Sequence, residues 1–427
     1  MLGRVLSSIR AFNPQARIFF MVLVGLSLVV DGLYSVLLNL YLLRLDYGTE
    51  FIGLVNAVGL LTFGLASLPA GILGSRFSTT GLMKSGAAVS LAGGLLLPMA
   101  EWLPPGWREA GFVLPPALMF GGFAFFFVNS APFLMNVVDD SYKHRAFALK
   151  AAHWSLAGFA GSLIAGLLPG AIAGMNAWTL EDPAPYRATF ALAAVVLALS
   201  VALSLRIRPL PPKAKPSPRE IAGDRGGARK GWAASVMTLI VIMTVIRLLQ
   251  VAGSATAMVY FNVYMDQHLA VSTALIGAMA AIGRLTGVPT ALLTPALVQR
   301  WGNIGVVIGA SLLATLCLIP MALVEHWLVA SFGYIGAISM MSVRYTAFIV
   351  YILDLVPRAQ QALMAGTGEA AAGLSFAMMA LGGGLLLTAF TFRDLFLLGA
   401  LIAFIGTALF WLYVFVAEPK RKLKPAL

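Results

Sequence analysis

Long apolar stretches constrain the fold of this chain more than any other feature of its sequence. A helix that crosses a lipid bilayer needs about 20 apolar residues, and twelve stretches of roughly that length or longer are present. They lie at 18–43, 51–74, 81–100, 111–137, 147–173, 188–205, 232–264, 272–298, 304–324, 328–353, 361–390 and 395–417. Charged residues make up only 11% of the chain, against roughly 25% in soluble domains. The pattern therefore predicts an all-α membrane protein with twelve transmembrane helices.

The longest polar interval lies at the centre of the chain. Residues 206–230 read RIRPLPPKAKPSPREIAGDRGGARK, with many prolines and glycines and a strong excess of Lys and Arg. Such a composition favours a solvated, flexible linker. Because six apolar stretches precede it and six follow, we predict two six-helix bundles, at 1–205 and 231–427, joined by a basic linker at 206–230.

The distribution of Lys and Arg predicts the orientation in the membrane. If the N-terminus is cytoplasmic, the linker and nearly all other basic residues are cytoplasmic as well, and the outer loops are rich in Asp and Glu. Both termini and the linker are therefore predicted to be cytoplasmic. The formal net charge of +12 is explained by this arrangement, so nucleic acid is not expected as a partner. The first residues show no signal cleavage site, so we expect a retained cytoplasmic tail whose first span acts as the signal anchor. The protein is expected to be a monomer that crosses the inner (plasma) membrane several times.

Short motifs recur in the same order in the two halves, which suggests an internal duplication. Several positions in the first half have a counterpart in the second: Asn39 with Asn262, Leu73 with Leu297, Arg76 with Arg300, Asp139 with Asp354, and Lys143 with Arg358. Two related halves with a cavity between them at mid-membrane predict alternating access, in which the halves rock against each other.

A motif between the second and third stretches resembles that of the major facilitator superfamily. The family pattern, roughly G-x-L-x-D-R-x-G-R-[RK], aligns with Gly71-Ile72-Leu73-Gly74-Ser75-Arg76-Phe77-Ser78. Gly71, Leu73 and Arg76 match, whereas Ser75 replaces the usual Asp and Ser78 the second glycine. The resemblance extends over the whole chain and implies a secondary transporter. The loss of the Asp puts in doubt the latch that this residue forms between the halves in the family.

Ionisable residues inside the apolar stretches are the candidate functional residues, because a charge at the bilayer centre costs roughly 2.5–3.5 kcal/mol or more. Asp31 lies halfway along the first stretch, and Tyr34, Ser35 and Asn39 follow on the same face of an α-helix. We expect Asp31 to be the proton-coupling carboxylate and Tyr34 and Asn39 to contact substrate. A permanent ion pair is the structural alternative for Asp31.

Two arginines are candidates for binding an anionic group of a substrate. Arg247 shares a helical face with Gln250 and Asn262, and this face is expected to oppose that of Asp31. Its alternative role is as the structural partner of Asp31. Arg284 lies mid-span just before Pro289, where it either contacts substrate or fills a polar gap. Asn129 is expected to line the same cavity.

The remaining candidates are expected to form gating ion pairs. Arg344 and Glu369 lie at similar depth, which predicts that they pair. At the cytoplasmic ends of the helices, pairs that form and break during rocking are expected from Arg76, Asp139, Lys143, Arg300, Asp354 and Arg358. Three core arginines against two carboxylates predict a net positive cavity.

Catalytic and cofactor motifs are missing from the sequence. It has no phosphate-binding glycine-rich loop, no His/Cys cluster with metal-ligand spacing and no hydrolytic triad, so neither an enzyme nor a cofactor is expected. We predict a secondary transporter of an organic small molecule, with anionic or amphipathic compounds favoured and protons as the coupling ion. Sodium remains open as the coupling ion, and a lipid or lysolipid carrier or flippase, or a non-transporting membrane receptor, remain alternative functions.

Overall fold

The computed structural model describes residues 13–138, 143–208, 230–356 and 358–422, and these are folded as helices joined by short turns. Within them, eleven helices are long and apolar enough to cross a membrane. In order, the elements are α2 (Pro14–Ser27), the π-helix η1 (Leu28–Tyr34), α3 (Ser35–Arg44), α4 (Thr49–Arg76), α5 (Thr79–Met99), the short η2 (Ala100–Trp102), α6 (Pro105–Val137), α7 (Lys143–Asn176), α8 (Ala184–Leu205), α10 (Lys230–Val263), the π-helix η4 (Tyr264–His268), α11 (Thr273–Leu323), α12 (Trp327–Asp354), α13 (Arg358–Leu386) and α14 (Phe392–Lys422).

The first span contains the candidate carboxylate in an unusual helical turn. Asn13 caps the span by accepting a 3.0 Å hydrogen bond from the Gln15 backbone N–H, and Pro14 occupies the first helical position. α2, η1 and α3 then run without interruption to Arg44. Asp31 lies in η1, whose wider i→i+5 turn is a form often found at functional sites.

The helix α11 is too long for one crossing. Its 51 residues would extend about 75 Å, more than twice the hydrocarbon thickness of a bilayer. The chain changes direction at Gly302, where φ is 70°, a conformation that glycine adopts without steric cost. This break lies between the stretches predicted at 272–298 and 304–324, so α11 consists of two apolar segments.

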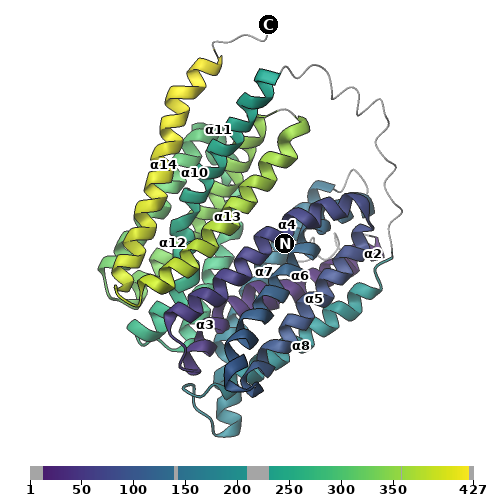
Figure 1. Ribbon diagram of the computed structural model, residues 1–427, viewed down its shortest axis with the longest axis vertical. Coiled ribbons are helices and arrows are strands. Elements are labelled where there is room, and N and C mark those ends of the chain that lie inside the picture. The colour runs from purple at the N-terminus through teal and green to yellow at the C-terminus, as the bar shows by residue number, and fades with distance from the viewer. Residues whose placement is uncertain (1–12, 139–142, 209–229, 357, 423–427) are drawn as a thin grey trace.

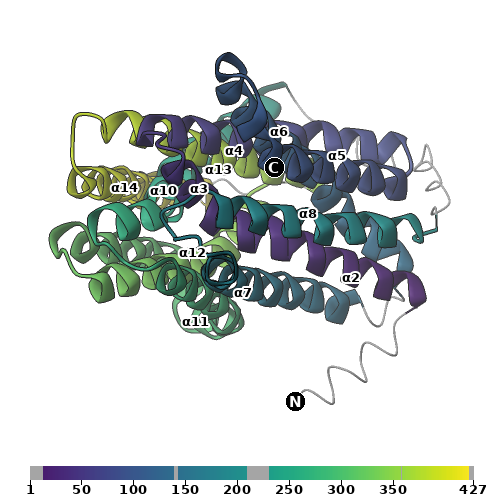
Figure 2. The same ribbon diagram turned by 90° about the horizontal axis from the view of Figure 1, so that it is seen from below.

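The helices form two groups that spread apart toward one end (Figure 1). α2–α8 lie on one side and α10–α14 on the other, and Figure 2 shows the same division from below. We call the end at which α8 stops and α10 starts the linker face, and the opposite end the closed face. The two groups converge at the closed face.

Small residues allow the two groups to meet backbone to backbone. A Cβ atom added at Gly53 of α4 would lie 2.4 Å from the Ala380 carbonyl oxygen of α13, and one added at Gly277 of α11 would lie 2.5 Å from the Gly166 Cα of α7. Glycine at such positions is typical of close helix packing in membranes. These contacts hold α4 against α13 and α7 against α11 near the closed face.

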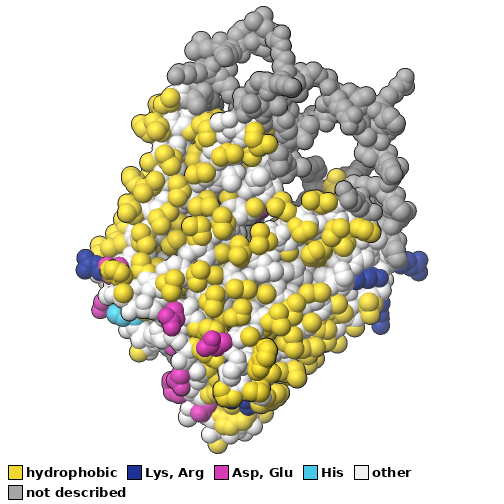
Figure 3. Space-filling view, viewed as in Figure 1, with side chains coloured by type: hydrophobic (Ala, Val, Ile, Leu, Met, Phe, Trp, Pro, Cys, Tyr) yellow, Lys and Arg dark blue, Asp and Glu magenta, His cyan; other side chains and the backbone are white. Residues whose placement is uncertain are grey.

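The surface has the distribution of side chains that a bilayer requires. Figure 3 shows hydrophobic side chains spread over the length of both groups, and acidic ones gathered at the closed face. Large apolar side chains point outward along the helices, such as Phe332 with 73% and Leu65 with 63% of its surface exposed. An apolar surface of this extent indicates contact with lipid.

Candidate functional site

An ion pair between Asp31 and Arg284 joins the two groups of helices. Arg284 Nε lies 3.2 Å from Asp31 Oδ2, connecting η1 to α11. The Nη2 atom of Arg284 also donates to the Asp31 carbonyl oxygen at 2.5 Å and to Ser35 Oγ at 2.7 Å. One guanidinium therefore binds the side chain of Asp31, its backbone and its neighbour one turn on.

The neighbouring residues leave space for this pair and keep it partly hydrated. Gly158 of α7 packs directly against it, and a Cβ atom there would lie 2.4 Å from Asp31 Oδ2. Tyr334 of α12 also hydrogen-bonds to Arg284. The Asp31 side chain is 24% exposed, against 8% for Arg284. Water can thus reach the carboxylate, while the guanidinium stays enclosed.

Two asparagines form a second layer of contacts between the groups, closer to the closed face. Asn39 of α3 donates to the Val259 carbonyl oxygen of α10 at 2.7 Å, and Asn262 of α10 donates to the Ser35 carbonyl oxygen at 2.7 Å. Asn56 of α4 donates to Asn39 Oδ1, also at 2.7 Å. The expectation that the polar faces of the first and seventh spans oppose each other is met here by direct contact.

A bidentate ion pair forms a third layer at the closed face. Arg44 donates to both carboxylate oxygens of Asp266, at 2.8 and 2.7 Å, and its Nε donates to the Leu180 carbonyl oxygen at 2.8 Å. Nearby, the hydroxyls of Tyr186 and Thr273 lie 3.1 Å apart. Between described residues, every hydrogen bond and ion pair that joins the two groups lies at Asp31 or on its closed-face side. Among the described residues, the polar contacts between the two groups are therefore concentrated toward the closed face.

The predicted pair of Arg344 with Glu369 is wrong. Glu369 Oε1 lies 3.7 Å from Arg247 Nη2 instead, and Arg247 also stacks over the rings of Tyr345 and Phe348. Arg344 is only 2% exposed and donates to Gln250 Oε1 at 3.5 Å. Similar depth in the membrane was therefore not enough to predict a pair, since Arg344 is enclosed and the Glu369 side chain is 49% exposed. The surplus arginine, Arg344, lies within the packing of α10–α14.

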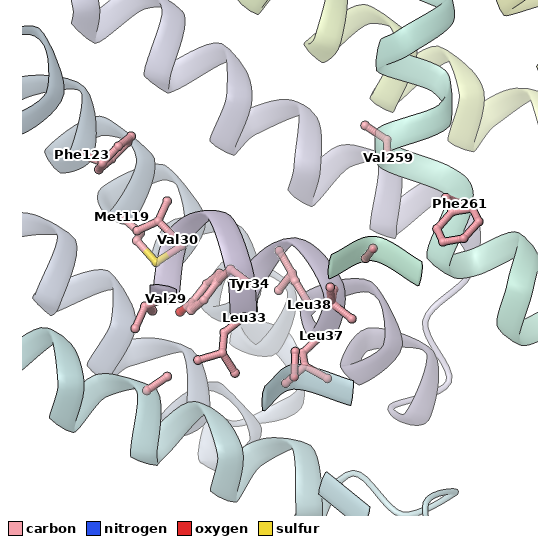
Figure 4. Packing of buried hydrophobic residues seen from close by; sticks show 14 of the residues in the cluster. Val29, Val30, Leu33, Tyr34, Leu37, Leu38, Met119, Phe123, Val259 and Phe261 are labelled. Carbon is pink, nitrogen blue, oxygen red and sulfur yellow. The ribbon is translucent and has the colours of Figure 1, made fainter. Parts of the chain in front are cut away.

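The structure places two predicted substrate residues in helix packing. Tyr34 is 2% exposed and packs edge-on against Phe190 of α8, among the apolar side chains shown in Figure 4. The π-helical turn is the reason, because i→i+5 bonding rotates the third residue after Asp31 away from the face that Ser35 keeps. Asn129 is 1% exposed and donates to the Ala70 carbonyl oxygen, which joins α6 to α4.

The predicted cytoplasmic gate is described only in part. Asp139 and the side chains of Arg76, Lys143 and Arg358 lie outside the described residues. Arg300 is exposed and its guanidinium lies 5.6 Å from the ring centre of Trp301. Asp354 is exposed, and neither it nor Arg300 forms an ion pair with a described residue.

Sequence reasoning missed two further contacts. Arg44 and Asp266 occupy nearly equivalent positions in the two halves, so the repeat offset that relates Asn39 to Asn262 was a signal for this pair. No motif in the sequence pointed to the second contact, which Lys150 makes. Its Nζ donates to Ser130 Oγ at 2.6 Å and lies 4.4 Å from the ring centre of Phe127.

Comparison with known proteins identifies the family. The sequence model of the Major Facilitator Superfamily matches residues 20–366. The chain belongs to the Major Facilitator Superfamily. The resemblance seen in the sequence is thereby confirmed, and membership of this superfamily indicates a multi-pass membrane transporter rather than an enzyme. No curated protein sequence matches this chain.

Several solved structures share this fold at low sequence identity. A bacterial homolog of the human lysosomal transporter Spinster, in an inward-facing and unoccupied conformation, has a TM-score of 0.71 at 11% identity, over 97% of this chain and 100% of that one. The nucleoside transporter NupG gives 0.70 at 14% identity, over 94% and 99% of the two chains. A D-xylose–proton symporter gives 0.69 at 13% identity, over 93% and 96%. At such low identity these structures show the superfamily fold alone.

Proposed function

We propose that this protein is a secondary active transporter that moves an organic small molecule across the inner membrane by alternating access, coupled to protons. The Asp31–Arg284 ion pair is the observation that carries the proposal. It connects the two groups of helices halfway along the first span, and its carboxylate is the partner that water can reach. A proton arriving at Asp31 therefore acts directly on the contact between the halves.

Protonation changes the strength of this contact. Ionised Asp31 compensates the buried guanidinium of Arg284, and this attraction is stronger at the low dielectric of the membrane interior than in water. A neutral Asp31 leaves Arg284 without its counter-ion. The ion pair that is farthest from the closed face is then lost, and the halves separate more easily at the closed face. Loading and release of the proton thus bias the two states of the transporter in opposite directions.

The orientation follows from the charge distribution. We assign the linker face to the cytoplasm because it carries the basic linker 206–230 and most other Lys and Arg residues. On this assignment the halves at 1–205 and 231–427 contribute six spans each, and we propose that the state is inward-open because the polar contacts between them lie toward the opposite end.

The same ion pair suggests the class of substrate. When Asp31 is neutral, the fork of donors on Arg284 becomes free to bind an anionic group such as a carboxylate. The substrate anion would then replace Asp31 as the partner of Arg284. Binding of the proton to Asp31 and binding of the substrate to Arg284 are coupled in this way. We therefore assign an organic anion as the favoured substrate class. Arg247 is only 5% exposed and is held by Glu369, so it is not assigned to the substrate site in this proposal.

Ligand-induced stabilisation tests this proposal without a known substrate. The purified full chain is screened against organic acids, neutral metabolites and lysolipids at two pH values, because a ligand of the native state raises Tm by mass action. We expect an organic anion to raise Tm in a pH-dependent manner. Asp31→Asn should bind the same compound with that pH dependence removed, and Glu109→Gln, an exposed carboxylate at the closed face, serves as the matched control.

A lipid or lysolipid carrier is the second candidate, and one observation favours it. A groove of about 540 Å³ near the closed face is lined entirely by apolar residues and glycine, among them Val58, Leu103, Trp107 and Leu114. An acyl chain fits such a lining. If lysolipids alone raise Tm, and Asp31→Asn responds as the wild type does at both pH values, the carrier replaces the proton-coupled transporter as the assignment.

A further inference from the structure

A small cavity inside the C-terminal group of helices is lined by hydrogen-bond donors. It lies among α10, α11, α12 and α14, so it is separate from the contact between Asp31 and Arg284. Its polar lining consists of Gln250, Ser254, Ser311, Thr315 and Arg344. The cavity volume, counted as the space open to the centre of a water-sized sphere, is about 10 Å³. A volume of this size holds one small particle.

Arg344 brings a positive charge to this cavity that no described carboxylate neutralises. Its one hydrogen bond to a described residue goes to the neutral Gln250 side chain, at 3.5 Å. The nearby Glu369 pairs with Arg247, and the Arg247 guanidinium itself repels that of Arg344. Removing an unpaired ion from water costs several kcal/mol even after relaxation of the protein. A negatively charged partner would therefore stabilise the buried Arg344 guanidinium.

Two other donors that line the cavity have no acceptor. Gln250 Nε2 and Ser311 Oγ are buried without a hydrogen-bond partner, in side chains that are 4% and 5% exposed. The remaining two hydroxyls are already used, because Ser254 donates to the Val251 carbonyl oxygen and Thr315 to that of Ser311, each at 2.9 Å. Buried donors in native proteins are nearly always paired. The cavity thus presents a cation and two free donors to one occupant.

We propose that this cavity binds one small monovalent inorganic anion of the halide class, such as chloride. A halide accepts hydrogen bonds from all directions and supplies the charge that Arg344 requires. A water molecule fits the space but carries no charge, and sulfate or an organic acid exceeds the room available. The bound anion connects α10, α11 and α12, so its effect is to stabilise the C-terminal group of helices.

Thermal unfolding of the purified full chain tests the proposal. Chloride replaces gluconate at constant sodium and constant ionic strength, and Tm is recorded at each step. The wild type should show a saturable rise in Tm with chloride and with bromide, and none with sulfate. Arg344→Gln should lose the saturable rise, whereas Arg393→Gln, an exposed arginine at the closed face, should keep it.

A matched pair of serine variants keeps the test decisive if Arg344→Gln does not fold. Ser311→Ala removes a free donor, and a hydrogen bond to a charged group contributes roughly 1.5–3 kcal/mol, so the chloride midpoint should rise about 10-fold or more. Ser254→Ala removes a hydroxyl whose donor is already used, so the midpoint should stay within about 2-fold of that of the wild type. A wild type whose Tm does not respond to halides, or a response that Ser311→Ala and Ser254→Ala share equally, would overturn the proposal.

Discussion

Arg44 and Asp266 form an ion pair in the outermost of three layers of polar contacts between the two groups of helices. Both amino groups of the guanidinium bind the carboxylate, and the two side chains are only 12% and 9% exposed. The pair lies about 20 Å along the helix from Asp31, at 1.5 Å per residue. The closed end is thus held by ionic contacts at its two limits, with the asparagine contacts between them.

Removing the outer pair should open the closed end. Arg44→Ala leaves Asp266 buried without its partner, which is strongly destabilising for a contact of this kind. Spin labels at Phe77→Cys and Trp301→Cys, exposed positions at the linker face, report the separation there in a Cys317→Ala background. We expect the distribution in Arg44→Ala to shift toward shorter distances than in the unsubstituted chain.

Glu181→Gln is the control for this experiment. Glu181 also lies near Arg44, at 3.5 Å, but its side chain is 84% exposed. Exposed ion pairs contribute about 0–1 kcal/mol, so the distances should remain those of the unsubstituted chain. Equal shifts in both variants would show that the buried pair has no special role in closure.

Gly158→Ala should disrupt the central ion pair without removing either charge. The added Cβ atom would lie 2.4 Å from Asp31 Oδ2, so the carboxylate or the helix must move. Overpacking of this kind costs about 1–3 kcal/mol. We expect a lower Tm and a weaker pH dependence of ligand-induced stabilisation.

Gly170→Ala in the same helix is the matched control, because nothing lies within 4 Å of an added Cβ atom there. Its Tm should equal or exceed that of the wild type, since alanine favours a helix over glycine. If Gly158→Ala behaves like Gly170→Ala, the close packing around Asp31 is not needed for coupling.

The turn that supports Arg44 should respond to pH through Asp182. Hydrogen bonds from the backbone N–H and the hydroxyl of Thr179 lower the pKa of Asp182 below its ordinary value. The resulting stability is therefore present above the unfolded-state pKa and is lost as pH falls through the folded-state pKa. We expect Asp182→Ala to have a slightly lower Tm than the wild type at neutral pH, with the difference narrowing as the carboxyl group is protonated. A difference that is constant across this range would contradict the assignment.

Local features of the sequence predicted the helices well, and the contacts between helices poorly. Apolar length located the spans, and the Gly302 break agrees with the predicted boundary in the eighth and ninth stretches. The repeat relates Asn39 to Asn262, and each of them donates to a backbone carbonyl oxygen in the helix of the other. Apolar length and the repeat can both be read directly from the order of residues along the chain.

Which charged residues pair depends on how each helix is rotated about its own axis. A single sequence does not reveal this rotation. Asp31 pairs with Arg284, although Arg247 was the partner weighed for it. Arg344 and Glu369 were predicted to pair from their similar depth, but Arg344 contacts Gln250 and Glu369 contacts Arg247. The π-helix around Asp31 has no sequence signature, and it is the reason that Tyr34 leaves the face of Asp31.

The most direct test of the account is the pH dependence of the linker-face distance between labels at Phe77→Cys and Trp301→Cys. We predict that lowering the pH shifts the otherwise unsubstituted chain from long toward short distances, because protonated Asp31 releases Arg284 and the closed end opens. Asp31→Asn should show the short distances at every pH, and Glu109→Gln should behave as the unsubstituted chain. A distance distribution that does not change with pH, or an Asp31→Asn variant that still responds to it, would contradict the role assigned to the Asp31–Arg284 pair.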